Sequence, residues 1–324
     1  MSLNRSALGV DCDREIGRIS RFIRAQVSAM RREGAVVGLS GGIDSAVAAE
    51  LCLRALGKEN VCALVLPEKE SQSRSAGLAL EHAAKMGLRA DVIDITPTLE
   101  GFRTYRMRDE AIKGVIPGYA PGQKMKVSLP PGLLDHESFN IYQLSVRDDS
   151  GQVVSARLKK DSLRAILAAT NTKQRTRMMH LYFRAERDNL LVCGTTNRTE
   201  YALGFFVKHG DGGVDIEPIA HLYKAQVYQL ADRLGVIEAI KSRVPSPDTF
   251  SEEVSDEEFY FRIPYETLDM LLYAWENKIA AGEAGAALNL TEDQVDRAFR
   301  DFAAKSRISS HLKTMPPRLK PLRR

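Results

Sequence analysis

The chain has 324 residues, of which 44% are hydrophobic and 27% charged, a composition that can bury a full apolar core in one domain spanning residues 1–324. The net charge is only +4 and the basic residues form no long cationic stripe, which argues against nucleic acid as a partner. No apolar run approaches the roughly 20 residues of a membrane span and the N-terminus lacks a signal-peptide pattern, so we expect a cytoplasmic protein with no membrane partner. The 4 cysteines form no CxxC pair and the 6 histidines lack metal-ligand spacing, which argues against a zinc site.

The first third of the chain alternates between helical patterns and short apolar runs. Apolar residues at helical spacing predict an amphipathic helix from Ile16 to Met30. The run Ala35–Leu39 has the length and β-branched content of a buried parallel strand, and a helical run follows from Ala46 up to Gly57. The same alternation predicts a further strand, helix and strand over Val61–Leu66, Ser73–Met86 and Ala90–Ile95.

An inserted segment, from about residue 113 to about residue 160, breaks this rhythm. Its first half is rich in proline and glycine, and its second half predicts a β-hairpin with strands Ile141–Val146 and Val153–Leu158. Two interpretations remain open. The segment is either a surface excursion, which costs little closure entropy, or a functional lid or partner surface.

The second half of the chain resumes the alternation of helices and strands. The pattern predicts a helix over Lys173–Arg187, a strand over Leu190–Cys193 and a helix over Leu222–Leu234. Together with the first half, this gives an α/β fold with a doubly wound parallel sheet and helices on both faces. Because ligands bind at the carboxyl ends of such strands, the loops after Leu39, Leu66 and Cys193 should converge.

A loop of sequence Ser-Gly-Gly-Ile-Asp-Ser, residues 40–45, joins the first predicted strand to its helix. Backbone N–H groups at a helix N-terminus lack partners and glycines let an anion approach them, so the loop suits pyrophosphate. Asp44 would repel a bare phosphate, which indicates that Mg²⁺ bridges the carboxylate and the phosphates. The alternative is a glycine-rich turn in which Asp44 or Ser45 caps the helix without a ligand. The hexapeptide resembles the signature of the ATP pyrophosphatase (N-type) superfamily, which implies cleavage of ATP to AMP and pyrophosphate.

A second group of motifs narrows this resemblance. Residues 194–200 read Gly-Thr-Thr-Asn-Arg-Thr-Glu directly after a predicted strand, and residues 204–215 contain the turn-rich stretch Lys-His-Gly-Asp-Gly-Gly. With Asn171–Met178 before them and Leu222–Lys224 after them, these motifs resemble the synthetase domain of the ammonia-dependent NAD synthetase family. The resemblance covers nearly all of the chain outside the insertion and implies an adenine nucleotide alpha hydrolase-like fold.

The resemblance also implies a role for individual residues. Asp44 and Glu200 would hold Mg²⁺, while Asp44 and Lys224 would be the catalytic residues. Chemistry alone does not separate Asp211 from Asp215 as the aspartate that binds the substrate. Arg175 and Arg177 lie two residues apart on a helix and point in different directions, and we favour Arg175 as the arginine that binds the substrate. The ATP site would comprise Ser40, Gly41, Gly42, Ile43, Asp44, Ser45, Thr195, Lys224 and Ser246. The deamido-NAD site would comprise Arg175, Lys208, Asp215, His311 and Lys313.

The reaction that the resemblance implies has two steps and needs no protein nucleophile. The nicotinate carboxylate of deamido-NAD attacks ATP and releases pyrophosphate, and ammonia then converts the acyl-adenylate to NAD and AMP. A glutamine-dependent version carries a large amidase domain first, whereas here the ATP loop begins 40 residues in, so we expect free ammonia or a separate amidase partner. Family analogy also implies a homodimer. Two alternatives stay open: another adenylating amidotransferase with a different carboxylate acceptor, and a catalytically silent nucleotide-binding regulatory subunit.

The chain departs from the family pattern in one further stretch. It reads Ser246-Pro247-Asp248-Thr249 where the family has Ser/Thr-Ala-Asp-Leu, and Phe259-Tyr260-Phe261 replaces a short Leu-Gly. These differences fall on the predicted ATP contact of Ser246 and on the local lid over the substrate.

Overall fold

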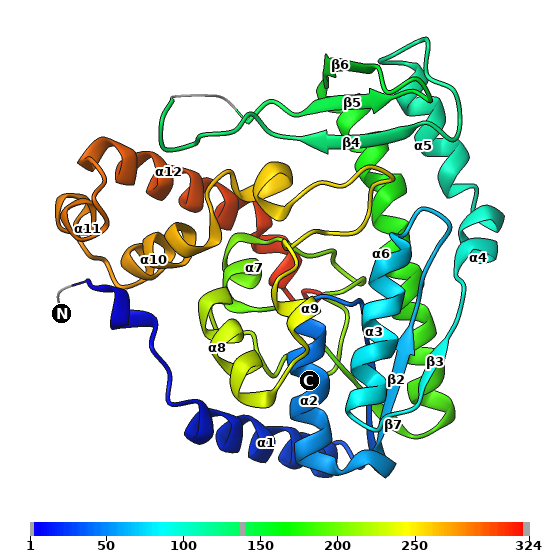
Figure 1. The fold of residues 1–324 in the computed structure, drawn as a ribbon, viewed down its shortest axis with the longest axis vertical. Helices are drawn as coiled ribbons and strands as arrows, with labels where there is room; N and C mark the ends of the chain where they lie inside the picture. The colour runs from blue at the N-terminus through cyan, green and yellow to red at the C-terminus, as the bar shows by residue number, and fades with distance from the viewer. Residues whose placement is uncertain (1–2, 137–139, 320–324) are drawn as a thin grey trace.

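The computed structural model describes residues 3–136 and 140–319 and contains a four-stranded parallel sheet in its lower half (Figure 1). The strand order is β3-β2-β1-β7, and Val36 in β1 lies beside Cys62 on one side and Val192 on the other. The strands are β1 (Gly34–Gly38), β2 (Val61–Val65), β3 (Ala90–Val92) and β7 (Leu190–Cys193). The predicted parallel sheet is confirmed, with strand ends that differ from the prediction by at most three residues.

Helices cover both faces of this sheet, as the alternating apolar pattern predicts. Ala35 and Val37 face one apolar cluster, whereas Val36 between them faces another. The first cluster lies under α1 (Cys12–Ala29), α2 (Ile43–Leu56), α3 (Ser73–Lys85) and α8 (Lys224–Leu234). The second lies under α4 (Thr96–Gly101), α5 (Thr104–Lys113) and α6 (Lys160–Arg187).

A third apolar cluster belongs to the C-terminal helices, which lie apart from the sheet in Figure 1. Its longest helices are α10 (Tyr265–Glu276), α11 (Ala281–Leu288) and α12 (Glu292–Ser309). The short elements α7 (Arg198–Leu203) and α9 (Glu238–Lys241) lie beside the carboxyl ends of the main strands. Single turns complete the fold: η1 (Arg5–Leu8), η2 (Lys58–Asn60), η3 (Glu257–Phe261) and η4 (Ser310–Lys313).

The inserted segment folds into a separate antiparallel sheet at the top of Figure 1. Its strands are β4 (Lys124–Ser128), β5 (Gln143–Arg147) and β6 (Val153–Arg157), in the order β4-β5-β6. The hairpin predicted over residues 141–158 is confirmed as β5 and β6. The sequence did not indicate β4, because prolines and glycines surround it.

The helix after the hairpin begins 13 residues earlier than predicted, at Lys160 rather than Lys173. Its apolar residues lie all around its axis, since it packs on the inserted sheet at one end and on the main sheet at the other. A helix with several neighbours lacks the single apolar stripe on which a prediction from periodicity depends.

Strand β4 is hydrogen-bonded to the segment that precedes α10. Met125 N donates to Ser251 Oγ at 2.9 Å, and Glu252 N donates to Met125 O at 3.1 Å. Leu129 N donates to Glu258 O at 2.8 Å. The inserted sheet and residues 250–262 therefore form one structural unit. Within residues 3–136 and 140–319, no helix has the length and apolarity to cross a membrane.

Candidate nucleotide and metal site

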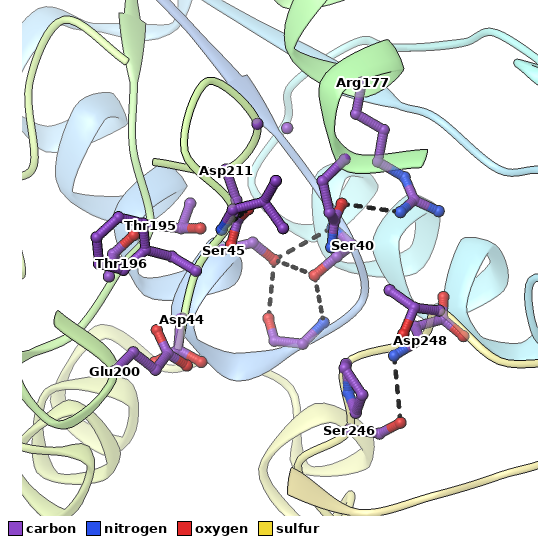
Figure 2. A pocket seen from close by; sticks show the side chains of 18 of the residues that line it. Ser40, Asp44, Ser45, Arg177, Thr195, Thr196, Glu200, Asp211, Ser246 and Asp248 are labelled. Atoms are coloured by element: carbon purple, nitrogen blue, oxygen red, sulfur yellow. Dashed lines mark hydrogen bonds between the residues drawn. The ribbon is translucent and has the colours of Figure 1, made fainter. Parts of the chain in front are cut away.

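The loop at residues 40–45 is held in shape by its own hydroxyl groups (Figure 2). Ser45 Oγ donates to Gly42 O at 2.9 Å and accepts from Ser40 N at 3.2 Å, and Gly42 N donates to Ser40 Oγ at 3.2 Å. Gly41 has a φ of +77°, and a Cβ there would lie 2.2 Å from the carbonyl oxygen of Ser75. No side chain caps α2, which begins at Ile43, so its first N–H groups remain available to an anion.

A cavity of about 460 Å³ opens over this loop. It is lined by the ends of β1, β2 and β7, including Leu39, Leu66 and Cys193, which confirms the predicted convergence of the three loops. Residues 243–249 line another side, and Tyr142 of the inserted segment also lines the cavity. The insertion therefore contributes to the pocket wall and is not only a surface excursion.

Two predicted metal ligands and the predicted catalytic lysine meet at one end of the cavity. Asp44 lies in the first turn of α2, Glu200 in that of α7, and Lys224 begins α8. Lys224 Nζ lies 2.5 Å from Asp44 Oδ2 and 3.8 Å from Glu200 Oε1. Asn197 Nδ2 donates to Asp44 Oδ1 at 2.9 Å, and Asn197 also forms the capping box of α7 with Glu200. Figure 2 shows the carboxylates of Asp44 and Glu200 side by side.

A third carboxylate, Asp256, lines the same cavity and was missed by the sequence analysis. Only 4% of Asp256 is exposed, its Oδ2 accepts from the hydroxyl of Tyr265 at 2.9 Å, and its Oδ1 has no hydrogen-bond partner among the described residues. Burial raises the pKa of Asp256 to about 6. The one sequence signal was its position in the stretch that departs from the family pattern.

The charges at this end of the cavity are unbalanced. When Asp44, Glu200 and Asp256 are ionised, the single ammonium group of Lys224 leaves two negative charges uncompensated. Burial and then Asp44 raise the pKa of Glu200 well above its usual value. Burial opposes the charge on Lys224, but the three carboxylates outweigh it and raise the lysine pKa.

This donor set fits a hard divalent cation, which prefers carboxylate oxygens and would neutralise the surplus charge. Over the part of the chain that the structure describes, no three acidic, histidine or cysteine side chains form a complete metal cage. A cation held by Asp44 and Glu200 would therefore take its remaining ligands from substrate phosphates and water.

The predicted ATP residues line the cavity except for Gly41, and an arginine that was not predicted as a site residue also lines it. Thr195 and Ser246 are lining residues, and Ser246 Oγ accepts from Asp248 N at 3.3 Å (Figure 2). Arg177 lines the cavity and donates from Nε to Leu66 O at 3.1 Å. Arg175, the arginine favoured from the sequence, lies outside it and donates to Lys208 O at 3.3 Å.

Most of the predicted deamido-NAD residues lie together beside the cavity. Lys208 Nζ donates to the carbonyl oxygen of His311 at 2.8 Å. The carbonyl oxygen of Lys208 in turn accepts from Arg175 Nε at 3.3 Å. Lys313 Nζ donates to Ala202 O at 2.9 Å and lies 5.0 Å from the ring centroid of Tyr201. The contacts of Arg175 and Lys208 run through backbone oxygens and connect α6 to the turn η4, which carries His311 and Lys313; we call these four residues the basic group.

Asp215 does not join this group or the cavity lining. Its Oδ2 accepts from Val192 N at 2.7 Å and its Oδ1 from the hydroxyl of Tyr182 at 3.0 Å, so both oxygens already have partners in the fold. Asp211 lines the cavity instead, and burial raises its pKa to about 6. The structure thus separates two aspartates that chemistry alone could not distinguish.

A buried ionic network next to the cavity was also missed. Lys173 Nζ lies 2.8 Å from Glu68 Oε1, 2.9 Å from Glu70 Oε2 and 2.9 Å from Thr249 O. Tyr105 donates its hydroxyl to Glu68 at 2.7 Å. Because Thr249 lines the cavity, this network connects α6 to the loop after β2 and to the pocket wall.

Comparison with known proteins gives consistent matches. A family model described as NAD synthase matches residues 15–119 and 135–313, leaving out residues 120–134, which contain β4. The NH(3)-dependent NAD(+) synthetase of Mesorhizobium japonicum is 46% identical over 310 residues, covering 95% of this chain and 97% of that relative. The protein of the same name from Thermotoga maritima is 38% identical over 255 residues, covering 79% of this chain and 84% of that relative.

Solved structures show a similar fold. The NH3-dependent NAD synthetase from Campylobacter jejuni has a TM-score of 0.63 at 24% identity, covering 96% of this chain and 100% of that one. An NMN synthetase from Francisella tularensis has a TM-score of 0.65 at 22% identity, covering 96% and 99%.

Proposed function

The chain belongs to the NAD synthase family, and we propose that it amidates deamido-NAD with ammonia at the expense of ATP, giving NAD, AMP and pyrophosphate. The observation that carries this proposal is the meeting of the loop at residues 40–45 with Asp44, Glu200 and Lys224 at one end of a single cavity. A regulatory protein that binds a nucleotide without catalysing a reaction would not require this charged cluster.

In the proposed reaction the protein acts by binding, orienting and compensating charge. The unpaired N–H groups at the start of α2 and the hydroxyls of Ser40 and Ser45 would bind the ATP phosphates. Lys224 would neutralise negative charge on the departing pyrophosphate. Thr195 and Ser246 would contact the nucleotide from the other walls of the cavity.

Asp44 and Glu200 would hold Mg²⁺. When bound, this ion supplies positive charge to the phosphoryl oxygens during displacement of pyrophosphate. Asn197 would orient Asp44 for this role through its 2.9 Å hydrogen bond, because a carboxylate held in place loses less entropy on binding a metal.

For the acceptor, we propose that the basic group of Arg175, Lys208, His311 and Lys313 binds the phosphates and ribose hydroxyls of deamido-NAD beside the cavity. We retain Asp215 as a residue that positions this site, because it connects Tyr182 of α6 to strand β7.

We also propose a homodimer, as family analogy implies. The side of α6 that carries Arg175 exposes two large apolar side chains one turn apart, Met179 at 59% and Phe183 at 66%. A second copy would cover them and bring its own side chains near the acceptor group. Ammonia would arrive free or from a separate amidase.

The test is to incubate the purified protein with deamido-NAD, ATP, Mg²⁺ and ammonium and to quantify NAD and AMP. Equal formation of both is expected, with an Asp44→Asn variant reduced at least about a hundredfold because it loses half of the carboxylate charge on the proposed metal. Nicotinate mononucleotide serves as the competing acceptor. ATP cleavage with another acceptor only would identify a related amidotransferase, and ATP binding without turnover would identify a regulatory subunit.

A further inference from the structure

Lys224 lies where a divalent cation between Asp44 and Glu200 would lie. Its Nζ is 2.5 Å from one carboxylate and 3.8 Å from the other, and the side chain is 2% exposed. An ammonium group and a divalent cation repel each other strongly at such separations in a partly desolvated site. Binding of the cation therefore requires the lysine to move to another acceptor.

Asp256 offers that acceptor. Its Oδ2 is held by the hydroxyl of Tyr265, and Lys224 Nζ already lies 5.1 Å from the centroid of the same tyrosine ring. Asp256 lines the cavity, and its Oδ1 is buried and has no hydrogen-bond partner within residues 3–136 and 140–319. A buried carboxylate oxygen without a partner is costly, so one is expected to be used in another state of the protein.

We infer that Lys224 stands in for the metal ion in the unloaded protein and that Asp256 receives its ammonium group when a divalent cation binds between Asp44 and Glu200. After this exchange Asp44 and Glu200 share the cation, and Asp256, whose Oδ1 has no hydrogen-bond partner among the described residues of the unloaded protein, is paired with the ammonium group. The movement also turns the lysine away from the metal ligands and into the part of the cavity that Asp256 borders. Asp256 is thus a positioning residue that acts through Lys224.

The inference rests on the proposed metal role of Asp44 and Glu200, but it can be tested without the reaction. The probe is Mn²⁺ alone, with no nucleotide, and the readout is its dissociation constant from the electron paramagnetic resonance of the free ion. If the Mn²⁺ affinities contradict the exchange, the proposed NAD formation can still be correct. If no NAD forms, the Mn²⁺ affinities still test the exchange.

Removal of the lysine should tighten metal binding. We expect Lys224→Met to bind Mn²⁺ at least about tenfold more tightly than the wild type, because the ion no longer displaces an ammonium group. The matched control, Lys58→Met, removes the same charge from an exposed side chain and should change the affinity less than about twofold. Unchanged or weaker binding by Lys224→Met would overturn the inference.

A double-mutant cycle tests the part played by Asp256. Asp256→Asn should weaken Mn²⁺ binding about tenfold in the wild type, because the displaced lysine has no partner, and this loss should shrink at least about threefold in the Lys224→Met background. Equal losses in both backgrounds would make Asp256 a direct partner of the ion and refute the exchange. If a variant does not fold, the wild type suffices: a crystal structure with Mn²⁺ should place Nζ beside Asp256, and Nζ still on Asp44 would refute it.

Discussion

Replacing Lys173 by methionine should destabilise the protein strongly, although the residue binds no substrate. Its side chain and that of Glu68 are each 1% exposed, and Glu70 is 15% exposed. Methionine fills a similar volume but leaves two buried carboxylates without their shared cation. Breaking a buried ion pair in this way costs about 3–5 kcal/mol. Because Arg108 still pairs with Glu70, we expect the lower end, about 3 kcal/mol.

The assay is urea unfolding followed by circular dichroism, with Lys69→Met as the matched control. Lys69 lies between Glu68 and Glu70, pairs with Glu100 at 2.8 Å and contacts the Tyr105 ring. Because its side chain is 45% exposed, loss of its charge should cost at most about 1 kcal/mol. Adding Glu68→Gln to Lys173→Met removes one unpaired charge and should recover part of the stability. A Lys173→Met variant within about 1 kcal/mol of the control, or no recovery, would refute the reasoning.

Three further predictions concern the loop, a buried acid and the surface of α6. Gly41→Ala should unfold more easily and bind ATP more weakly than Gly57→Ala, measured by urea unfolding and calorimetry, because both glycines have positive φ but only Gly41 adds a clash with Ser75. Burial raises the pKa of Glu217 from 4.5 to about 8, so the folded protein holds this proton more tightly than the unfolded chain and stability should fall as pH rises across that interval. In urea titrations at about pH 5.5 and pH 8.5, the Glu217→Gln variant should not show this fall in the free energy of unfolding; an equal fall in the variant and the wild type would contradict the prediction. Phe183→Glu should turn the expected dimer into a monomer in sedimentation equilibrium, and a dimeric variant would place the interface elsewhere.

The sequence predicted the main sheet and the location of the pocket because both depend on local signals. Strands β1, β2 and β7 are short apolar runs between turn-forming residues, and a parallel sheet brings their carboxyl ends together whatever the details of packing. The loop at residues 40–45 could be placed at that edge from its neighbours alone.

The parts that escaped prediction depend on partners distant in the chain. The role of Lys173 depends on glutamates more than 100 residues before it, and the free oxygen of Asp256 is visible only once Tyr265 and the cavity are in place. Asp211 and Asp215 have the same chemistry and similar neighbours in sequence. Only the fold shows that Asp215 is already bonded by Val192 and Tyr182.

The hydrogen bonds between β4 and the segment before α10 bear on how these two stretches evolved in the family. Residues 120–134 are the internal stretch that the family model does not match. Their hydrogen-bond partners, Ser251, Glu252, Glu258 and Arg262, lie on both sides of Phe259-Tyr260-Phe261, where we expect a departure from the family pattern. Loss of one stretch would leave backbone donors and acceptors of the other without hydrogen-bond partners. The two should therefore have been acquired together, and a homologue that lacks the first should also have the shorter form of the second.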